Sequence, residues 1–273
     1  MTGAELSLLS AAAFLTAVLS AIVGMAGGMT LLVVMLLFLD PLVAIPLHGV
    51  VQLVSNGTRV TIQRAHVRWE VPARYALLLL PAGLLGVHLA QDAPKEALRV
   101  AIGVFVLLAT WTPGLFLWPL RRFGGAAGAR SAGDGADASA GVAGAPVALP
   151  TWRFVILGGV MGALNVTVGA TGTLLSPFFL NLGLTRHEVI GTKAACQTIG
   201  HLVKIGVFGA VGFAFLEHAP LLAAMSLAVV GGSWVGSRIL EKVAEVWFVL
   251  LYKAVLTALA LRLALVDGWR LLG

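Results

Sequence analysis

Long apolar runs alternate with short polar or glycine-containing breaks along the whole chain. Ten runs can be counted, five on each side of a Gly/Ala-rich stretch at 121–150. The runs of the first half are Leu6–Val23, Met29–Leu39, Leu42–Ile62, Val71–Ala90 and Ala97–Trp118, and those of the second half are Phe154–Val168, Leu174–Leu184, Glu188–Phe215, Leu221–Leu240 and Val243–Val266. A helix needs about 20 predominantly apolar residues to cross a bilayer, and most of the runs come near that length. The pattern predicts an all-α polytopic membrane protein.

The second run of each half is too short to cross a membrane. Met29–Leu39 and Leu174–Leu184 hold about eleven residues each, and at 1.5 Å per residue such a helix covers only about half of a ~30 Å hydrocarbon core. Each follows a glycine-rich break, and broken helices occur at membrane depth where they line a polar cavity or are buried in protein. We therefore predict two inverted-topology repeats with a short half-helix in each, residues 1–120 and 151–273, joined by a flexible linker at 121–150.

The composition agrees with a membrane protein. Of the 273 residues, 59% are hydrophobic and 11% are charged, whereas soluble domains carry about 25% charged residues. The formal net charge of +6 would suit a nucleic-acid-binding protein, but the basic residues lie in the breaks between apolar runs. That distribution is the positive-inside pattern of membrane proteins. We expect a lipid bilayer and no nucleic acid as partner.

The positions of Lys and Arg also predict the orientation. The loop at 64–74 and the linker region at 121–153 are strongly basic, whereas the turn at Asp40, the loop at Glu217 and the amino terminus contain no basic residue. The basic segments are expected on the cytoplasmic side, which places both termini outside in a cell inner membrane. Tyr75 and the tryptophans at segment ends are expected to form an interfacial aromatic belt.

A stripe of polar residues occurs at the third run of each half. Lys193, Gln197, His201 and Lys204 follow one another at spacings of four, four and three, which places them on one face of a helix. The same face is found 145 positions earlier, at His48, Gln52, Asn56 and Arg59. The two glutamines each lie about eleven residues into their segment, or ~16 Å, which is near the middle of the membrane. We expect the two stripes to meet there and to line a polar cavity.

Glycine-rich breaks precede the two short runs, again 145 positions apart. They read Gly24-Met25-Ala26-Gly27-Gly28 and Gly169-Ala170-Thr171-Gly172-Thr173. The first N–H groups of the following half-helices and the positive ends of their dipoles would form an anion site. The alternative is close helix packing, which we expect for Gly158, Gly159, Gly162, Gly232 and Gly236.

The chemistry of the predicted cavity favours an anionic substrate, because the acidic residues Asp40, Glu188 and Glu217 all fall near segment ends. Two alternatives remain: Lys193 and Lys204 could extend to the membrane surface, and His48 and His201 could be interhelical hydrogen-bonding groups rather than proton carriers. The predicted substrate-binding residues are Gly24, Gly27, Gly28, His48, Gln52, Asn56, Gly169, Thr171, Gly172, Thr173, Lys193, Gln197 and His201, with Arg59, Lys204 and Asn165 as gating or secondary residues.

These motifs resemble the TauE/SafE family of sulfite and organosulfonate exporters. The resemblance rests on the two glycine breaks, on Leu175-Ser176-Pro177, and on Ile190-Gly191-Thr192-Lys193 leading into a polar helix, and it extends over nearly the whole chain outside the linker. It implies a permease for a small sulfur-containing anion, such as sulfite, sulfoacetate or a thiosulfate-like ion.

Three functions are compatible with this pattern. The first is a secondary transporter, most simply an exporter, with its site between the two halves and with a homo-oligomer as a possible assembly. The second is a passive anion channel. The third is an intramembrane scaffold or enzyme, which the sequence disfavours because Cys196 stands alone and no carboxylate pair, metal-spaced cluster or catalytic triad occurs at membrane depth. We expect no enzymatic activity, no metal and no cofactor.

Overall fold

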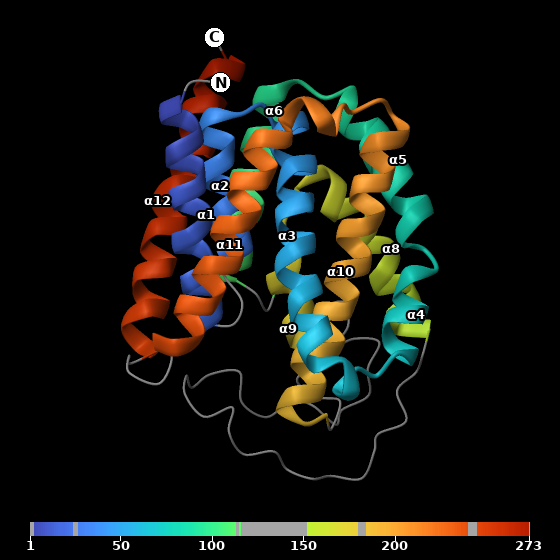
Figure 1. Cartoon of the computed structure of the whole chain (residues 1–273). Helices are drawn as coiled ribbons and strands as arrows, with labels where there is room; N and C mark the ends of the chain where they lie inside the picture. Colours follow the sequence, from blue (N-terminus) through green and yellow to red (C-terminus); the bar gives the residue numbers. More distant parts are fainter. Residues whose placement is uncertain are drawn as a thin grey trace.

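The computed structural model describes residues 3–23, 27–112, 115, 152–179, 184–239 and 245–272, and the regular structure in these ranges is helical (Figure 1). The helices of the first half are α1 (Gly3–Val23), α2 (Gly27–Phe38), α3 (Pro41–Gln63), η1 (Arg64–His66), α4 (Glu70–Ala76), α5 (Leu79–Gln91) and α6 (Lys95–Trp111). Those of the second half are α8 (Trp152–Thr167), α9 (Gly172–Phe179), α10 (Arg186–Ala210), η2 (Phe215–His218), α11 (Ala219–Ile239) and α12 (Glu245–Leu272). The all-α prediction is confirmed for the described ranges, and the predicted linker lies outside them.

The two short helices are found where the sequence predicts them. Helix α2 has 12 residues and α9 has 8, so each is shorter than a membrane crossing requires. The helices that follow begin with clear signals. Pro41 occupies the start of α3, and Thr185 and Glu188 form a capping box at the start of α10. Each half therefore contains a short helix followed by a long helix that carries the polar stripe.

Three of the predicted segments end or bend earlier than expected, and the first is Ala97–Trp118, whose helix α6 ends at Trp111 with a non-helical backbone at Thr112. The run Val71–Ala90 is not one helix: α4 and α5 are separate and meet at an angle of 41°. The run Glu188–Phe215 ends as a helix at Ala210, because Gly212 adopts a positive φ of 89° and the N–H of Phe213 bonds back to the carbonyl of Phe208 at 2.9 Å. This is a Schellman-type termination, which apolar periodicity cannot reveal.

Helices of one half pack mainly against helices of the other half. The most extensive pairs are α1 with α11, α5 with α8, α6 with α12, and α3 with α10. In Figure 1, α3 and α10 stand in the centre, with α1, α2, α11 and α12 on one side and α4, α5 and α8 on the other. The two stripe-bearing helices are therefore neighbours in the middle of the bundle.

Small residues allow several of these pairs to approach closely. A Cβ atom added at Gly158 or Gly162 of α8 would collide with the backbone carbonyl oxygen of Tyr75 or Leu79. The same holds where α11 meets α1, at Gly232. The predicted packing role is thus confirmed for these glycines.

Two helical stretches in the described ranges are long and apolar enough to cross a membrane, Gly3–Ala21 and Phe215–Gly236, and the bent pair α4 and α5 would be a third. The beginning of α1 and the end of α12 lie at the same end of the bundle (Figure 1). Termini on one side of a membrane require that arrangement, and the side itself stays a prediction.

Candidate functional site

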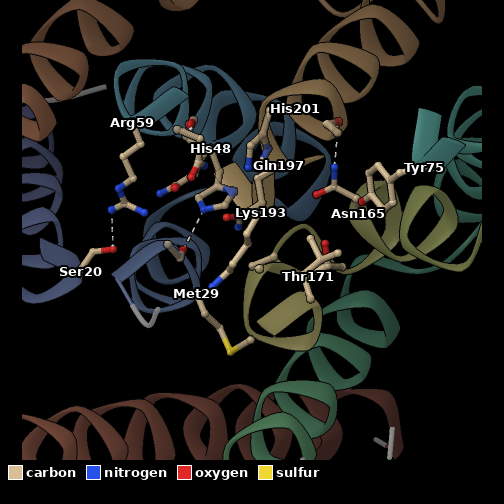
Figure 2. A pocket seen from close by; sticks show the side chains of 17 residues that line it. Ser20, Met29, His48, Arg59, Tyr75, Asn165, Thr171, Lys193, Gln197 and His201 are labelled. Atoms are coloured by element: carbon tan, nitrogen blue, oxygen red, sulfur yellow. Dashed lines mark hydrogen bonds between the residues drawn. The ribbon is translucent and has the colours of Figure 1, made fainter. Parts of the chain in front are cut away.

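A polar cavity lies between α3 and α10, the two helices in the middle of the bundle in Figure 1, and Figure 2 shows the side chains around it. Its volume is about 30 Å³, which is room for roughly two water molecules. A cavity of this size suits a ligand of a few heavy atoms. The residues that line it are Ser20, Gly28, Met29, His48, Gln52, Asn56, Arg59, Tyr75, Asn165, Ala170, Thr171, Gly172, Leu175, Lys193, Gln197, Gly200 and His201.

The charged groups that line the cavity are cationic. Lys193 is 8% exposed, and the guanidinium of Arg59 lies at the side of α1, where it donates a hydrogen bond of 3.0 Å to the hydroxyl of Ser20. Neither aspartate nor glutamate occurs among the described lining residues. The buried acid Asp267 lies elsewhere and pairs with Arg99 at 3.4 Å. The cavity is therefore suited to an anion, and the burial of Lys193 argues against its extending to the surface.

The two glutamines of the stripes lie over the first residues of the short helices. A Cβ atom at Gly28 of α2 would come within 3.1 Å of the Gln52 amide, and a Cβ atom at Gly172 of α9 would collide with Nε2 of Gln197. Glycine at these positions thus lets an amide approach the start of a helix closely. Both glutamines line the same cavity.

The two predicted histidines face each other across the boundary between the halves. The rings of His48 and His201 have centroids 6.1 Å apart in an edge-to-face arrangement, and both residues are buried. Nε2 of His48 lies 2.8 Å from the carbonyl oxygen of Gly28. A carbonyl oxygen only accepts hydrogen bonds, so Nε2 carries the proton, and in the neutral ring Nδ1 is then an acceptor. His48 thus holds the start of α2 as well as lining the cavity.

In Figure 2, Asn165 and Tyr75 lie on the opposite side of the cavity from Arg59. The amide nitrogen of Asn165 donates to the carbonyl of Gly200 at 2.9 Å. Tyr75 is 1% exposed and contributes to the lining, so its predicted place in an interfacial belt is wrong. The close packing of α4 on α8 draws this ring inward, although Tyr75 lies near the end of an apolar run.

Several of the predicted residues lie outside the cavity lining. Lys204 is fully buried, and its ammonium group donates a hydrogen bond of 2.6 Å to the carbonyl of Gly169. Gly169 itself has a φ of +87°, which favours glycine and ends α8. Gly27 packs against α1, where a Cβ atom would collide with the carbonyl oxygen of Thr16. These three residues shape the backbone around the cavity.

Gly24 lies outside the described residues, as does the side chain of Thr173, whose backbone belongs to the first turn of α9. The remaining predicted residues do line the cavity: Gly28, His48, Gln52, Asn56, Arg59, Asn165, Thr171, Gly172, Lys193, Gln197 and His201.

Some of the lining residues were not predicted from the sequence. Ser20 could have been found, since it lies 145 positions before Asn165 and so shares the repeat offset. Ala170 belongs to the second glycine break and Leu175 to the Leu175-Ser176-Pro177 motif, although neither was predicted to bind substrate. Met29 and Gly200 are ordinary residues of a helical membrane protein. Among the described residues, no group of three or more His, Cys, Asp or Glu side chains could hold a metal ion.

Comparison with known proteins identifies one family. The family model described as sulfite exporter TauE/SafE matches residues 9–263, which is nearly the whole chain. No curated protein and no solved structure shows a significant match.

Proposed function

The chain belongs to the TauE/SafE sulfite exporter family, a family of membrane transporters, and from this premise we propose that it is a secondary transporter that exports a small sulfur-containing anion. The substrate binds in the cavity between α3 and α10, where the two halves of the chain meet. A scaffold or an enzyme is a poorer description, because the family is one of transporters.

The observation that carries the proposal is the combination of groups around the cavity. The cation Lys193 and the amides of Gln52 and Gln197 line one small space without a described carboxylate. Charge-assisted hydrogen bonds from an ammonium group to an oxyanion are about twice as strong as neutral ones. The amides supply further donors, and the first turns of α2 and α9 bring positive helix-dipole ends to the same region. Together they suit a compact oxyanion.

The packing of the helices supports the proposed inverted repeat of 1–120 and 151–273. In repeat order, α1 and α8 are equivalent, as are α11 and the pair α4 and α5. The contact of α1 with α11 then has its counterpart in the contact of α8 with α5, while α3 pairs with α10 and α6 with α12. A twofold axis between the halves relates such pairs. Rocking of the halves about this axis would expose the cavity to each side in turn.

Transport by purified protein in liposomes tests the proposal. Vesicles loaded with unlabelled sulfite should accumulate labelled sulfite from outside by counterflow, with saturable kinetics. Lys193→Gln should abolish most of this signal at submillimolar substrate. Flux without saturation or counterflow would instead indicate the passive channel, and absence of any sulfite or sulfonate flux would refute the proposal.

The proposed orientation has an independent test. The native Cys196 is fully buried, so a cysteine introduced by Ser131→Cys in the linker should give the main labelling signal. A membrane-impermeant maleimide should label it in inside-out vesicles and leave it unlabelled in right-side-out vesicles. Labelling only from outside would reverse the proposed topology, in which the linker is cytoplasmic and both termini are external.

A further inference from the structure

The cavity contains hydrogen-bond acceptors as well as donors, and two of these acceptors have no hydrogen-bond partner among the described residues. Asn165 is 5% exposed, and its Oδ1 atom is buried without a hydrogen bond in the part of the chain that the structure describes. The orientation of this amide is fixed, because its nitrogen donates to the carbonyl of Gly200 at 2.9 Å. Figure 2 shows the oxygen turned toward the side of the cavity where Lys193 and Thr171 lie.

A second acceptor comes from the other half. Because Nε2 of His48 donates to the carbonyl of Gly28, the Nδ1 atom of the neutral ring is an acceptor, and it too is buried without a hydrogen bond to any described residue. Burial of an acceptor without a hydrogen bond lowers the stability of the folded state. Such atoms in native proteins therefore generally have a partner, and a bound ligand can supply it. An anion that carries only acceptor oxygens would leave both atoms without a hydrogen bond. Its oxygen lone pairs would also face those of Oδ1 of Asn165 and Nδ1 of His48, which is repulsive.

We propose that the transported species is an oxyanion that also carries a hydrogen-bond donor, an O–H or N–H group, which it donates to Oδ1 of Asn165. This inference rests on the proposed function and narrows its substrate class. A monoprotonated sulfur oxyanion has such a donor, whereas a simple alkanesulfonate does not. Lys193 and the glutamine amides bind the charged oxygens, and Asn165 selects for an anion that carries an O–H or N–H donor.

Two anions of equal charge and similar size test the inference directly. Sulfamate carries an NH₂ group where methanesulfonate carries a methyl group, and both have the same SO₃⁻ group. Wild-type protein in detergent should bind sulfamate roughly 5- to 150-fold more tightly than methanesulfonate, as expected when a buried acceptor is satisfied in one complex only. Thermal-shift titration measures both affinities in one preparation.

Variants show which acceptor is responsible. Asn165→Leu should lower the affinity for sulfamate alone and so bring the two affinities within about twofold of each other. The matched control is Asn56→Leu, which also removes a cavity amide that donates to a backbone carbonyl, here that of Gln52 at 3.0 Å. It should preserve the preference for sulfamate. If the role of Asn165 is purely structural, Asn165→Leu should lower the affinity for both anions by the same factor.

The outcomes separate this inference from the proposed function. Equal affinity of wild-type protein for the two anions would overturn the donor requirement and leave an anion transporter. Failure to bind sulfamate, methanesulfonate and sulfite alike would overturn the anion site itself. If Asn165→Leu does not fold, the wild-type comparison still decides the question.

Discussion

The α2–α3 arm of the first half and the α9–α10 arm of the second half have the same design and use it differently. In both, a short helix begins with glycine under the amide of a glutamine on the following long helix. In both, one member of the stripe bonds a backbone carbonyl of the glycine break. In the first half that member is His48, bonded to Gly28, and in the second half it is Lys204, bonded to Gly169.

The cations occupy opposite ends of the two stripes. His48 and Lys193 are equivalent by the 145-residue offset, as are Arg59 and Lys204. In the first pair, Lys193 of the second half lines the cavity as a cation. In the last pair, Arg59 of the first half does so. Each half therefore uses one end of its stripe to hold the backbone and the other to provide charge. If the two halves are the inverted repeats proposed above, they divide these tasks while keeping the same order of a short helix followed by a long one.

The largest expected difference between the arms concerns their first helical glycines. Gly27→Ala places a methyl group against the backbone carbonyl of Thr16, which cannot move without shifting α1. Among the described residues, the methyl group of Gly172→Ala meets the flexible amide end of Gln197 and no backbone atom. We expect Gly27→Ala to destabilise the protein by about 3 kcal/mol. Gly172→Ala should fold normally and lose anion affinity because Gln197 is displaced.

Thermal unfolding in detergent and sulfite binding measure the two effects. Gly206→Ala is the control, since a Cβ atom there would meet no atom of the described residues within 4 Å. If both glycine variants lose stability equally, the two breaks have the same packing role, and the comparison fails at this point.

The next difference concerns the two lysines of α10. Lys193→Gln should fold and lose about 1.5 to 3 kcal/mol of binding free energy, or about 10- to 150-fold in affinity, because it removes a charge-assisted hydrogen bond. Lys204→Met should mainly lose stability, by about 1 to 3 kcal/mol, because it leaves the carbonyl of Gly169 without its donor. Binding isotherms and melting curves of the two variants, taken together, test the division.

The reverse result is informative. Should Lys204→Met bind sulfite weakly while melting like wild type, Lys204 would be a ligand, and the proposed exchange of roles between the stripes would be wrong. Lys193→Arg is a useful companion variant, because a planar guanidinium does not replace a compact ammonium group.

The sequence predicted the site residues best where helical periodicity alone decides which face of a helix a residue lies on. A 3.6-residue period alone brings Gln52 and Asn56 to one face of α3, and Gln197 and His201 to one face of α10. The same rule includes Lys204 in the stripe. Its ammonium group nevertheless reaches the carbonyl of Gly169 instead of the cavity, and this choice depends on how α8 ends. Helical periodicity describes a face and does not identify the partner of each side chain on it.

The sequence did not predict the positions of residues that depend on how helices pack against one another. Tyr75 lies near the end of an apolar run, where an aromatic residue usually marks the membrane surface. It reaches the cavity because α4 bends away from α5 and packs on Gly158 of α8. The termination of α10 at Gly212 was missed for a similar reason, since the run of apolar residues continues past the end of the helix.

The smallest expected effect tests the symmetry of the site. Gln52→Ala and Gln197→Ala each remove a neutral hydrogen bond, which is worth about 0.5 to 1.5 kcal/mol, or about 2- to 12-fold in sulfite affinity. If the anion lies on the axis between the halves, the two variants should weaken binding by similar factors. They should also couple in the double variant, because residues that contact one ligand are not independent. Calorimetric titration of sulfite into wild type, both single variants and the double variant gives all four affinities. A loss confined to Gln197→Ala would place the anion beside Lys193 in the second half, and the two arms would then differ in binding as well as in charge.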